Sequence, residues 1–236
     1  MASIDELDAR FYPDYVDEHV RFERAIRRYL RPEHTVLDAG AGRGDRYPYD
    51  YRNWVRLVVG VDLHERVREN ANLHSAAISD VAHLPFADGT FNLVFSKYLL
   101  EHLTEPIRAL REFRRVLEPD GHFVFHTPNR FHYVALAARL TPHRFHAWFN
   151  AKRGRPGHET FKTLYRANSR LAIGRLAAQT GFRIIELELF EPKPSYLFFN
   201  PLAYRAGIAY ERLVSRIHAL RDLRCVMVGV LEAVRP

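Results

Sequence analysis

The sequence predicts an α/β fold built on a mostly parallel sheet. Three observations predict it: short apolar runs alternate with amphipathic helical segments, a glycine-rich turn follows the first run, and an acidic residue ends the second. Strands that alternate with helices pair in parallel through right-handed crossovers. The chain has 236 residues, of which 47% are hydrophobic and 27% charged, so we expect one folded domain with a substantial core.

The elements follow from these patterns in chain order. Seven strands are predicted at 35–38, 57–62, 74–78, 91–96, 122–127, 182–189 and 224–232. Helical periodicity predicts helices at 17–30, 106–118, 169–180 and 201–220. The Pro-Asp-Gly turn at 119–121 is expected to launch the fifth strand, and Gly181 to end the helix before the sixth. Residues 45–54 contain Pro48 and three tyrosines, which predicts an irregular segment there.

The most informative stretch is 36–44, which reads Val-Leu-Asp-Ala-Gly-Ala-Gly-Arg-Gly. Its glycines let backbone N–H groups approach a ligand closely, and its C-terminal end is expected to open a helix. A dinucleotide fingerprint requires Gly-x-Gly-x-x-Gly, but Asp45 stands where its third glycine would be. The Gly-Lys-Ser/Thr of a P-loop is also missing. Because a carboxylate precedes the loop at Asp38, a cationic ligand group fits better than a phosphate.

This stretch resembles motif I of the class I S-adenosylmethionine-dependent methyltransferases. Further segments resemble the same family in order, namely Asp62, 78–81, 84–91, 100–103 and 115–121, and the likeness is greatest to the methyltransferase type 11 group. Asn92 departs from the aspartate that the family has after this phenylalanine. The resemblance covers residues 35–130 and implies a Rossmann-like sheet of seven strands, mostly parallel with the seventh antiparallel, with helices on both faces.

The resemblance also implies that S-adenosyl-L-methionine is the cofactor. The acids at the ends of the first three strands then divide its parts among them: Asp38 lies near the methionine moiety, Asp62 binds the ribose hydroxyls, and Asp80 meets the adenine amino group. The other cofactor contacts that we expect are Gly40, Ala41, Gly42, Gly44, Leu63, Val81, Ser96, Lys97 and Tyr12.

The expected organisation is a single methyltransferase domain over 1–236, with an N-terminal cap segment at 1–30 and a donor-binding core at 35–127. Two lid-forming insertions at 128–168 and 190–222 leave the carboxyl ends of strands, the edge where open α/β sheets bind ligands. The first carries seven bases against one acid between 144 and 170, which favours an anionic acceptor; solvated arginines over an aromatic core are the alternative. Expected substrate contacts are Asn129, Arg153, Arg155 and His158.

Methyl transfer needs a positioned acceptor and, for a hydroxyl or ammonium group, a base. His102 and His126 are the candidate bases, each with a structural alternative, and Tyr98 is a candidate to orient the acceptor. The expected function is methyl transfer to oxygen or nitrogen of a small metabolite, either anionic or lipid-linked. The alternatives are an RNA- or membrane-associated methyltransferase and a noncatalytic nucleotide-binding module. His143-x-x-His146 lacks a third ligand at suitable spacing, so no metal site is expected.

The formal net charge of +7 favours anionic partners, or else reflects a basic, solvated surface. Nucleic acid is not the expected partner, because no RNA-binding module accompanies the core. The single cysteine, Cys225, excludes a disulfide framework, and no apolar run is long enough for a membrane span, so a cytoplasmic protein is expected. The segment 196–220 has a narrow apolar face flanked by arginines. It suits peripheral membrane contact, packing on the domain or packing on a second subunit, and the oligomeric state stays open.

Overall fold

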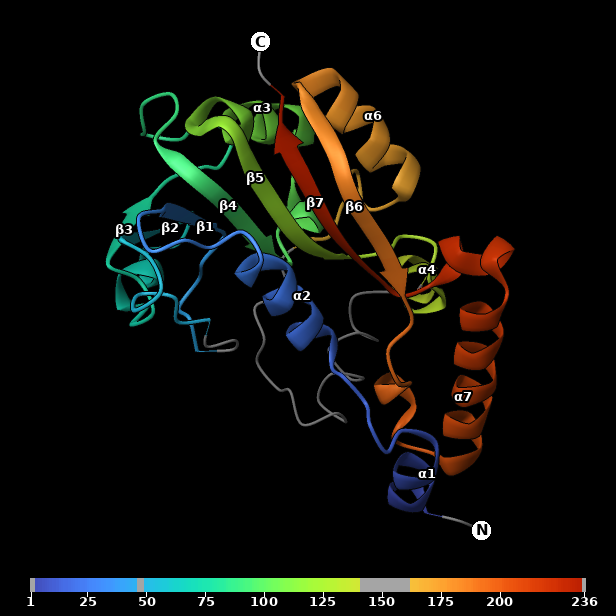
Figure 1. The fold of residues 1–236 in the computed structure, drawn as a ribbon. Helices are drawn as coiled ribbons and strands as arrows, with labels where there is room; N and C mark the ends of the chain where they lie inside the picture. The colour runs from blue at the N-terminus through green and yellow to red at the C-terminus, as the bar shows by residue number, and fades with distance from the viewer. Residues whose placement is uncertain (1–2, 46–48, 141–161, 235–236) are drawn as a thin grey trace. The chain divides into compact units, whose positions relative to one another are not determined.

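The computed structural model describes residues 3–45, 49–140 and 162–234 (Figure 1). The predicted substrate contacts Arg153, Arg155 and His158, and the His143/His146 pair, lie outside these residues. The chain divides into two compact units. The insertion unit comprises Met1–Glu18, Pro128–Lys162 and Leu189–Val226, and the sheet unit comprises His19–Thr127, Thr163–Glu188 and Met227–Pro236.

The sheet has seven strands in the order β3-β2-β1-β4-β5-β7-β6. Their bounds are β1 (Thr35–Ala39), β2 (Leu57–Asp62), β3 (Ser75–Ile78), β4 (Phe91–Lys97), β5 (Leu117–Pro128), β6 (Phe182–Phe190) and β7 (Val226–Ala233). Six strands are parallel and β7 runs antiparallel to them (Figure 1). The predicted Rossmann-like sheet is confirmed.

Helices cover both faces of the sheet, which is why its central strands are apolar on both sides. On one face lie α3 (Pro106–Val116) and α6 (Arg170–Thr180), where the ring of Phe113 lies 4.8 Å from that of Phe123 on β5. On the other face α2 (Glu18–Arg27) places Phe22 6.5 Å from Phe95 on β4, between ring centroids. Gly181 ends α6 in the left-handed conformation with φ of 76°, as predicted.

Two predicted boundaries are wrong. β5 begins at Leu117, which pairs with Phe91, and the register then shifts before His122 pairs with Leu93. The Pro-Asp-Gly segment is therefore a bulge within the strand, with φ of 64° at Asp120, instead of a turn that precedes it. The helix predicted at 201–220 ends as α7 (Pro201–Arg216), and a 3-10 turn at His218–Leu223 follows. Described residues 49–54 hold only turns and coil, as predicted for that segment.

In the insertion unit, α1 (Ile4–Phe11) packs on α7. Leu7 of α1 forms a buried cluster with Tyr204 and Ile208 of α7. Asp8 reinforces the contact, because its carboxylate accepts a hydrogen bond from the Tyr204 hydroxyl at 2.6 Å. The unit also contains α4 (Tyr133–Leu140) and a 3-10 turn at Ser195–Leu197. None of the helices among the described residues is long and apolar enough to cross a membrane.

Candidate functional site

The strand register brings three predicted site residues to one face of the sheet. β1 and β4 pair in parallel with Asp38 opposite Phe95, and β4 pairs with β5 so that Lys97 lies opposite His126. Because alternate residues of a strand face the same side, Asp38, Lys97 and His126 all project toward the face that α2 covers. They lie at or near the carboxyl ends of their strands, the edge where open α/β sheets bind ligands.

The glycine loop after β1 combines structural and open positions. Gly40, Gly42 and Gly44 all have positive φ, at 77°, 53° and 76°. A side chain on Gly44 would place its Cβ 2.1 Å from Oδ1 of Asn70, whereas a Cβ on Gly42 would meet no atom of the described residues within 4 Å. A side chain at Gly44 would therefore have to displace the Asn70 amide, and the positive φ adds backbone strain. Gly42 faces open space that a ligand is free to use.

Asp62, at the end of β2, holds this loop in place. Its Oδ2 accepts the Gly42 backbone N–H at 3.0 Å, and its Oδ1 accepts that of His64 at 2.9 Å. Leu63 beside it is 69% exposed, which leaves an apolar surface at the ligand edge. After β3, Asp80 is exposed and accepts the Ala82 N–H at 2.9 Å.

The electrostatics of Asp38 favour a cationic ligand. The residue keeps some solvent exposure, but its carboxyl group lies deep in the protein. Burial, and to a smaller extent repulsion from Asp62, raises the pKa of Asp38 to about 8. A positive group between these two acids would relieve both effects, because it stabilises the ionised forms.

Lys97 supplies the opposite charge at the end of β4. Its ammonium contacts Nδ1 of His19 and the hydroxyl of Tyr49. It also lies 4.7 Å from the ring centroid of Tyr49 and 5.7 Å from that of Tyr98, within range of cation–π attraction. The sheet unit thus holds a lysine ammonium among aromatic rings. On β4, Lys97 lies two residues beyond Phe95, the residue that pairs with Asp38.

His126 is a poor candidate for the base. It is fully buried, with its ring 5.6 Å from Phe22 and 4.7 Å from Tyr98. Burial, and then the positive charge of Lys97, holds the pKa of His126 well below its ordinary value. Neither ring nitrogen has a hydrogen-bond partner among the described residues. An imidazole that resists protonation to this extent has little driving force as a proton acceptor, although its role in catalysis stays a prediction.

Tyr98 has φ of 54°, the left-handed conformation that tyrosine rarely adopts. Its backbone N–H donates to the carbonyl of His126 at 2.9 Å, so β4 and β5 hold it there. Backbone strain of this kind concentrates at functional sites, where surrounding structure compensates for it. The conformation supports Tyr98 as a site residue and places its ring over His126.

Glu101 is a candidate site residue that the sequence analysis did not select. It lies in the 3-10 turn Leu100–His102 and is 4% exposed. Its carboxylate accepts the Thr127 hydroxyl at 3.0 Å, and that hydroxyl accepts the Asn168 amide at 2.6 Å. Burial raises the pKa of Glu101 to about 7. His102 Nε2 lies 3.9 Å from the Glu101 carboxylate while its side chain is 28% exposed, so the imidazole stands between a buried acid and solvent.

Glu101→Gln is expected to flatten the pH dependence of stability. The folded-state pKa of about 7 exceeds the ordinary value of 4.5, so the native protein keeps a proton that the unfolded chain releases, and stability falls as pH rises through that interval. Removing the charge should add about 1–3 kcal/mol to the free energy of unfolding near neutral pH. Chemical denaturation across this interval measures it, with the exposed Glu105→Gln as control. A wild-type slope in Glu101→Gln would contradict the expectation.

Four other predicted residues have mainly structural contacts. Asn129 is buried, and its amide donates to the carbonyls of Asp222 and Arg224 at 2.7 Å each, which braces the insertion unit. The Tyr12 hydroxyl contacts Glu211 at 3.4 Å in the same unit. Ser96 and Val81 are buried in the sheet unit. Ligand contacts by these residues stay predictions.

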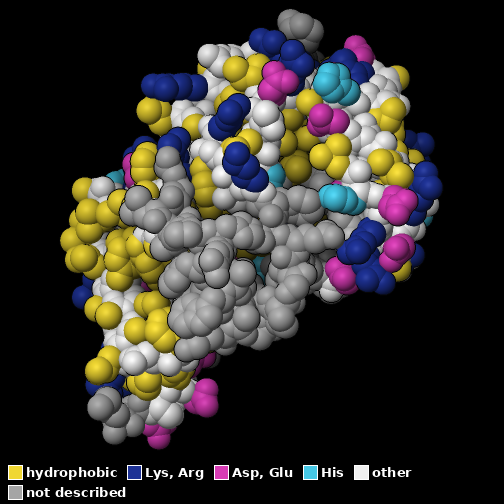
Figure 2. All heavy atoms as spheres, turned by 180° about the vertical axis from the view of Figure 1, so that it is seen from behind, with side chains coloured by type: hydrophobic (Ala, Val, Ile, Leu, Met, Phe, Trp, Pro, Cys, Tyr) yellow, Lys and Arg dark blue, Asp and Glu magenta, His cyan; other side chains and the backbone are white. Residues whose placement is uncertain are grey.

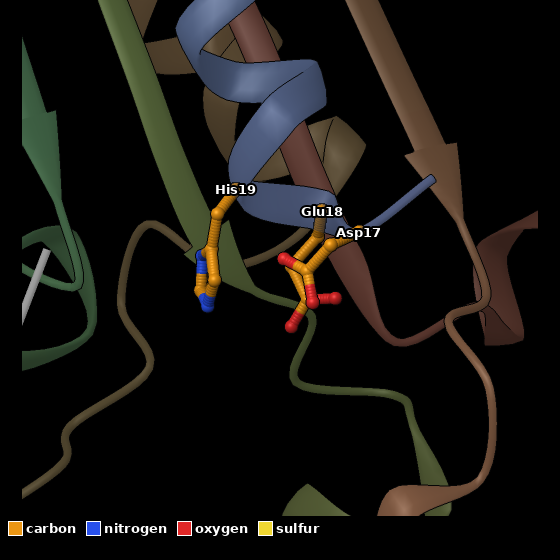
Figure 3. A group of neighbouring side chains, drawn as sticks. All are labelled: Asp17, Glu18 and His19. Atoms are coloured by element: carbon orange, nitrogen blue, oxygen red, sulfur yellow. The ribbon is translucent and has the colours of Figure 1, made fainter. Parts of the chain in front are cut away.

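Three consecutive side chains, Asp17, Glu18 and His19, have ligand atoms within 4.8 Å of one another and hang from the start of α2 (Figure 3). Their proximity follows from their adjacency in sequence. The Glu18 carboxylate accepts the Tyr15 hydroxyl at 3.2 Å, and Nδ1 of His19 contacts the Lys97 ammonium. A neighbouring ammonium opposes a bound cation, so we assign no metal to this group.

Residues 37–125 match the protein family described as a methyltransferase domain. Demethylmenaquinone methyltransferase of Chlamydia trachomatis serovar L2 is 38% identical over 112 residues, which cover 44% of this chain and 48% of that protein. Malonyl-(acyl-carrier protein) O-methyltransferase of Geobacter sulfurreducens is 39% identical over 98 residues, covering 38% and 37%. The matched segment thus spans less than half of either relative.

The fold has matches among solved structures. Geranyl diphosphate C-methyltransferase from Streptomyces coelicolor A3(2), in complex with Mg²⁺, geranyl diphosphate and S-adenosyl-L-homocysteine, superposes with a TM-score of 0.56 at 19% identity. The superposition covers 92% of this chain and 79% of that protein. At this identity the likeness is one of fold.

Proposed function

We propose that residues 37–125, which match a methyltransferase domain, form a class I S-adenosylmethionine-dependent methyltransferase core, and that the protein transfers the methyl group of S-adenosylmethionine to a small-molecule acceptor. One observation carries the proposal: the carboxyl edge of the sheet presents a buried acid, Asp38, and a lysine, Lys97, on the same face. The donor ends in an amino acid that carries an ammonium and a carboxylate next to its sulfonium. The two side chains have the charges that complement it.

The proposed donor pose follows the strand ends. Asp38 accepts hydrogen bonds from the ammonium, and Lys97 donates to the carboxylate. Asp62 binds the ribose hydroxyls while it continues to accept the Gly42 N–H. The space beside Gly42 lets the ligand approach the backbone of the loop. Leu63 and Val81 flank the adenine, with Asp80 at its amino group. Each contact follows the resemblance to the family.

The donor supplies a methyl group already activated on a sulfonium. The protein then has to hold the acceptor in line and exclude water, which can lower the barrier by roughly 7–11 kcal/mol. We propose His102 as the group that takes the acceptor proton, because it is partly exposed and backed by the Glu101 carboxyl at 3.9 Å. Tyr98 orients the acceptor. A base beside the acceptor favours oxygen or nitrogen as the methylated atom, because a hydroxyl or ammonium group has to lose a proton.

One matched relative is named for demethylmenaquinone and the other for malonyl-(acyl-carrier protein), so the acceptors in their names differ. Their variety supports a small metabolite without selecting one. The excess of bases between 144 and 170 supports an anionic acceptor, with Arg153, Arg155, His158 and Asn129 as its proposed contacts.

Donor binding and donor turnover test the proposal separately. Calorimetry with S-adenosylmethionine should give saturable binding, and NAD should give none, because the loop lacks the dinucleotide fingerprint. Incubation of the protein with methyl-labelled donor and fractionated metabolite extracts should transfer label to one small compound. Absence of donor binding would refute the proposal. Binding without transfer to any fraction would favour a noncatalytic donor-binding module instead.

Asp62→Ala is expected to weaken donor binding by about 1.5–3 kcal/mol, the magnitude of hydrogen bonds to a charged group. Two effects contribute: the ribose hydroxyls lose their acceptor, and the Gly42 N–H loses the carboxylate that fixes the loop. Calorimetric titration of the purified variant measures the loss. Asp62→Asn, which keeps one acceptor oxygen, should lose less. Wild-type affinity in Asp62→Ala would exclude the ribose role.

A further inference from the structure

The outer face of α7 carries an exposed apolar stripe. Leu202, Leu213 and Ile217 are 60%, 50% and 44% exposed, and Ala206 and Ala209 lie between them on the same line of the helix. The opposite face holds the buried Tyr204, Ile208 and Val214. Hence α7 uses its inner face to pack, while the α7 stripe (Leu202, Ala206, Ala209, Leu213 and Ile217) faces outward.

Aromatic residues extend this surface at its N-terminal end. Phe198 and Phe199 lie just before Asn200, the N-cap of α7, and are 42% and 63% exposed. In Figure 2 hydrophobic side chains gather along the edge of the molecule that carries α7 in Figure 1. Contiguous apolar surface of this kind on a soluble chain marks an interaction site.

Arginines line one flank of the stripe. Arg205, Arg212 and Arg216 are exposed and lie on the same side of it, at spacings of seven and four residues. Within 198–221 the only acid is Glu211, whose side chain is 12% exposed and pairs with Arg212 at 3.3 Å, which leaves Arg205 and Arg216 without an acid in this segment. The surface therefore combines exposed apolar bulk with net positive charge.

We propose that the α7 stripe, with Phe198 and Phe199, docks the protein on an anionic lipid bilayer, with α7 lying in the plane of the interface. An amphipathic helix with arginines beside its apolar face has the chemistry of interfacial membrane helices, since the guanidinium groups reach lipid phosphates while the apolar side chains enter the acyl boundary. A second copy of the chain would bring the same arginines and the same net charge of +7. An anionic bilayer brings the opposite charge.

Vesicle co-sedimentation of the full-length protein tests this inference. Vesicles of phosphatidylcholine mixed with phosphatidylglycerol should retain the protein, and phosphatidylcholine alone should retain much less. The double variant Leu202→Glu/Leu213→Glu should lose at least about tenfold in partitioning, because two charges enter the apolar boundary. The matched control is Leu171→Glu on α6, which is 63% exposed and lies outside the stripe, and it should bind as wild type.

A second pair of variants tests the charge. Arg205→Gln/Arg216→Gln should reduce binding to the anionic vesicles by about 25-fold and weaken its salt dependence, since each basic side chain near such a surface contributes about fivefold. Thermal denaturation and donor calorimetry should remain wild type in all these variants, which separates docking from the proposed methyl transfer. Equal vesicle binding by the double glutamate variant would overturn the proposal. So would a dimer in solution that the same substitutions dissociate, because the stripe would then face a second copy.

Discussion

Asp38→Asn is expected to weaken S-adenosylmethionine binding by about 3 kcal/mol, a little over a hundredfold, the effect of removing one partner of a buried charge pair. The same substitution should raise the melting temperature of the ligand-free protein. Both effects have one cause: the folded chain keeps an acid where burial and Asp62 oppose its ionisation. Only a cationic ligand makes that arrangement favourable.

The sign of the stability effect follows from the raised pKa. The folded value of about 8 lies above the ordinary 3.8, so the native protein retains a proton that the unfolded chain has released, and stability falls as pH rises through this interval. Asparagine does not ionise, which should add about 2–4 kcal/mol at the upper end of the interval after allowance for solvent access. Thermal denaturation with and without donor measures both effects.

The exposed Asp45→Asn, in the same loop, provides the control and should change neither quantity. Binding of 5′-methylthioadenosine, which lacks the amino acid end of the donor, should be nearly unaffected by Asp38→Asn. If the variant binds the complete donor as tightly as wild type does, Asp38 does not face the ammonium. A lower melting temperature in the ligand-free variant would show that the Asp38 carboxyl is satisfied within the protein.

The sheet was predictable because local patterns determine it. Apolar runs end in Asp38 and Asp62, and Gly40, Gly42 and Gly44 follow the first of them at every second position. These local signals predict where β1 and β2 end. The start of β5 was mispredicted because the pairing of Leu117 with Phe91 depends on a neighbouring strand. The Pro-Asp-Gly signal indicates a turn in isolation, but a parallel partner accommodates the extra residues as a bulge.

The surroundings of the site residues were not predictable in the same way. The Lys97 ammonium contacts His19 and Tyr49, which lie 78 and 48 residues away along the chain. Glu101 is adjacent in sequence to the predicted His102, but its burial depends on Thr127 and on the Asn168 amide beyond it. No periodicity connects residues that far apart.

The outward face of α7 illustrates a further limit of pattern reading. Leu202, Leu213 and their neighbours form the more regular apolar stripe, yet the helix packs through Tyr204 and Ile208. The choice is made by α1, where Leu7 contacts these residues and Asp8 accepts the Tyr204 hydroxyl. An amphipathic pattern identifies an apolar face, but it does not identify the surface that covers it.

Lys97→Met is expected to weaken S-adenosylmethionine binding by about 1.5–3 kcal/mol, the magnitude of a hydrogen bond between charged groups. Methionine is one heavy atom shorter than lysine, keeps an unbranched side chain that packs against the aromatic rings, and removes the charge. The decarboxylated donor lacks the carboxylate that the ammonium is proposed to bind. Its affinity should therefore be almost the same in wild type and variant, and calorimetry with both donors measures the difference directly.

This comparison separates three roles for Lys97. If the variant loses affinity for both donors equally, the ammonium acts by holding the site together through Tyr49 and His19, and Tyr49→Phe should reproduce part of the loss. If both affinities are unchanged but the KM for the acceptor rises, the ammonium faces an anionic group of the acceptor. In every case the variant should raise the pKa of His126, since the positive charge that lowers it is gone, although burial still keeps it below the ordinary value. NMR titration of the His126 ring follows that change independently of any ligand. Even if neither donor's affinity changes, the titration shows whether the Lys97 charge acts on His126.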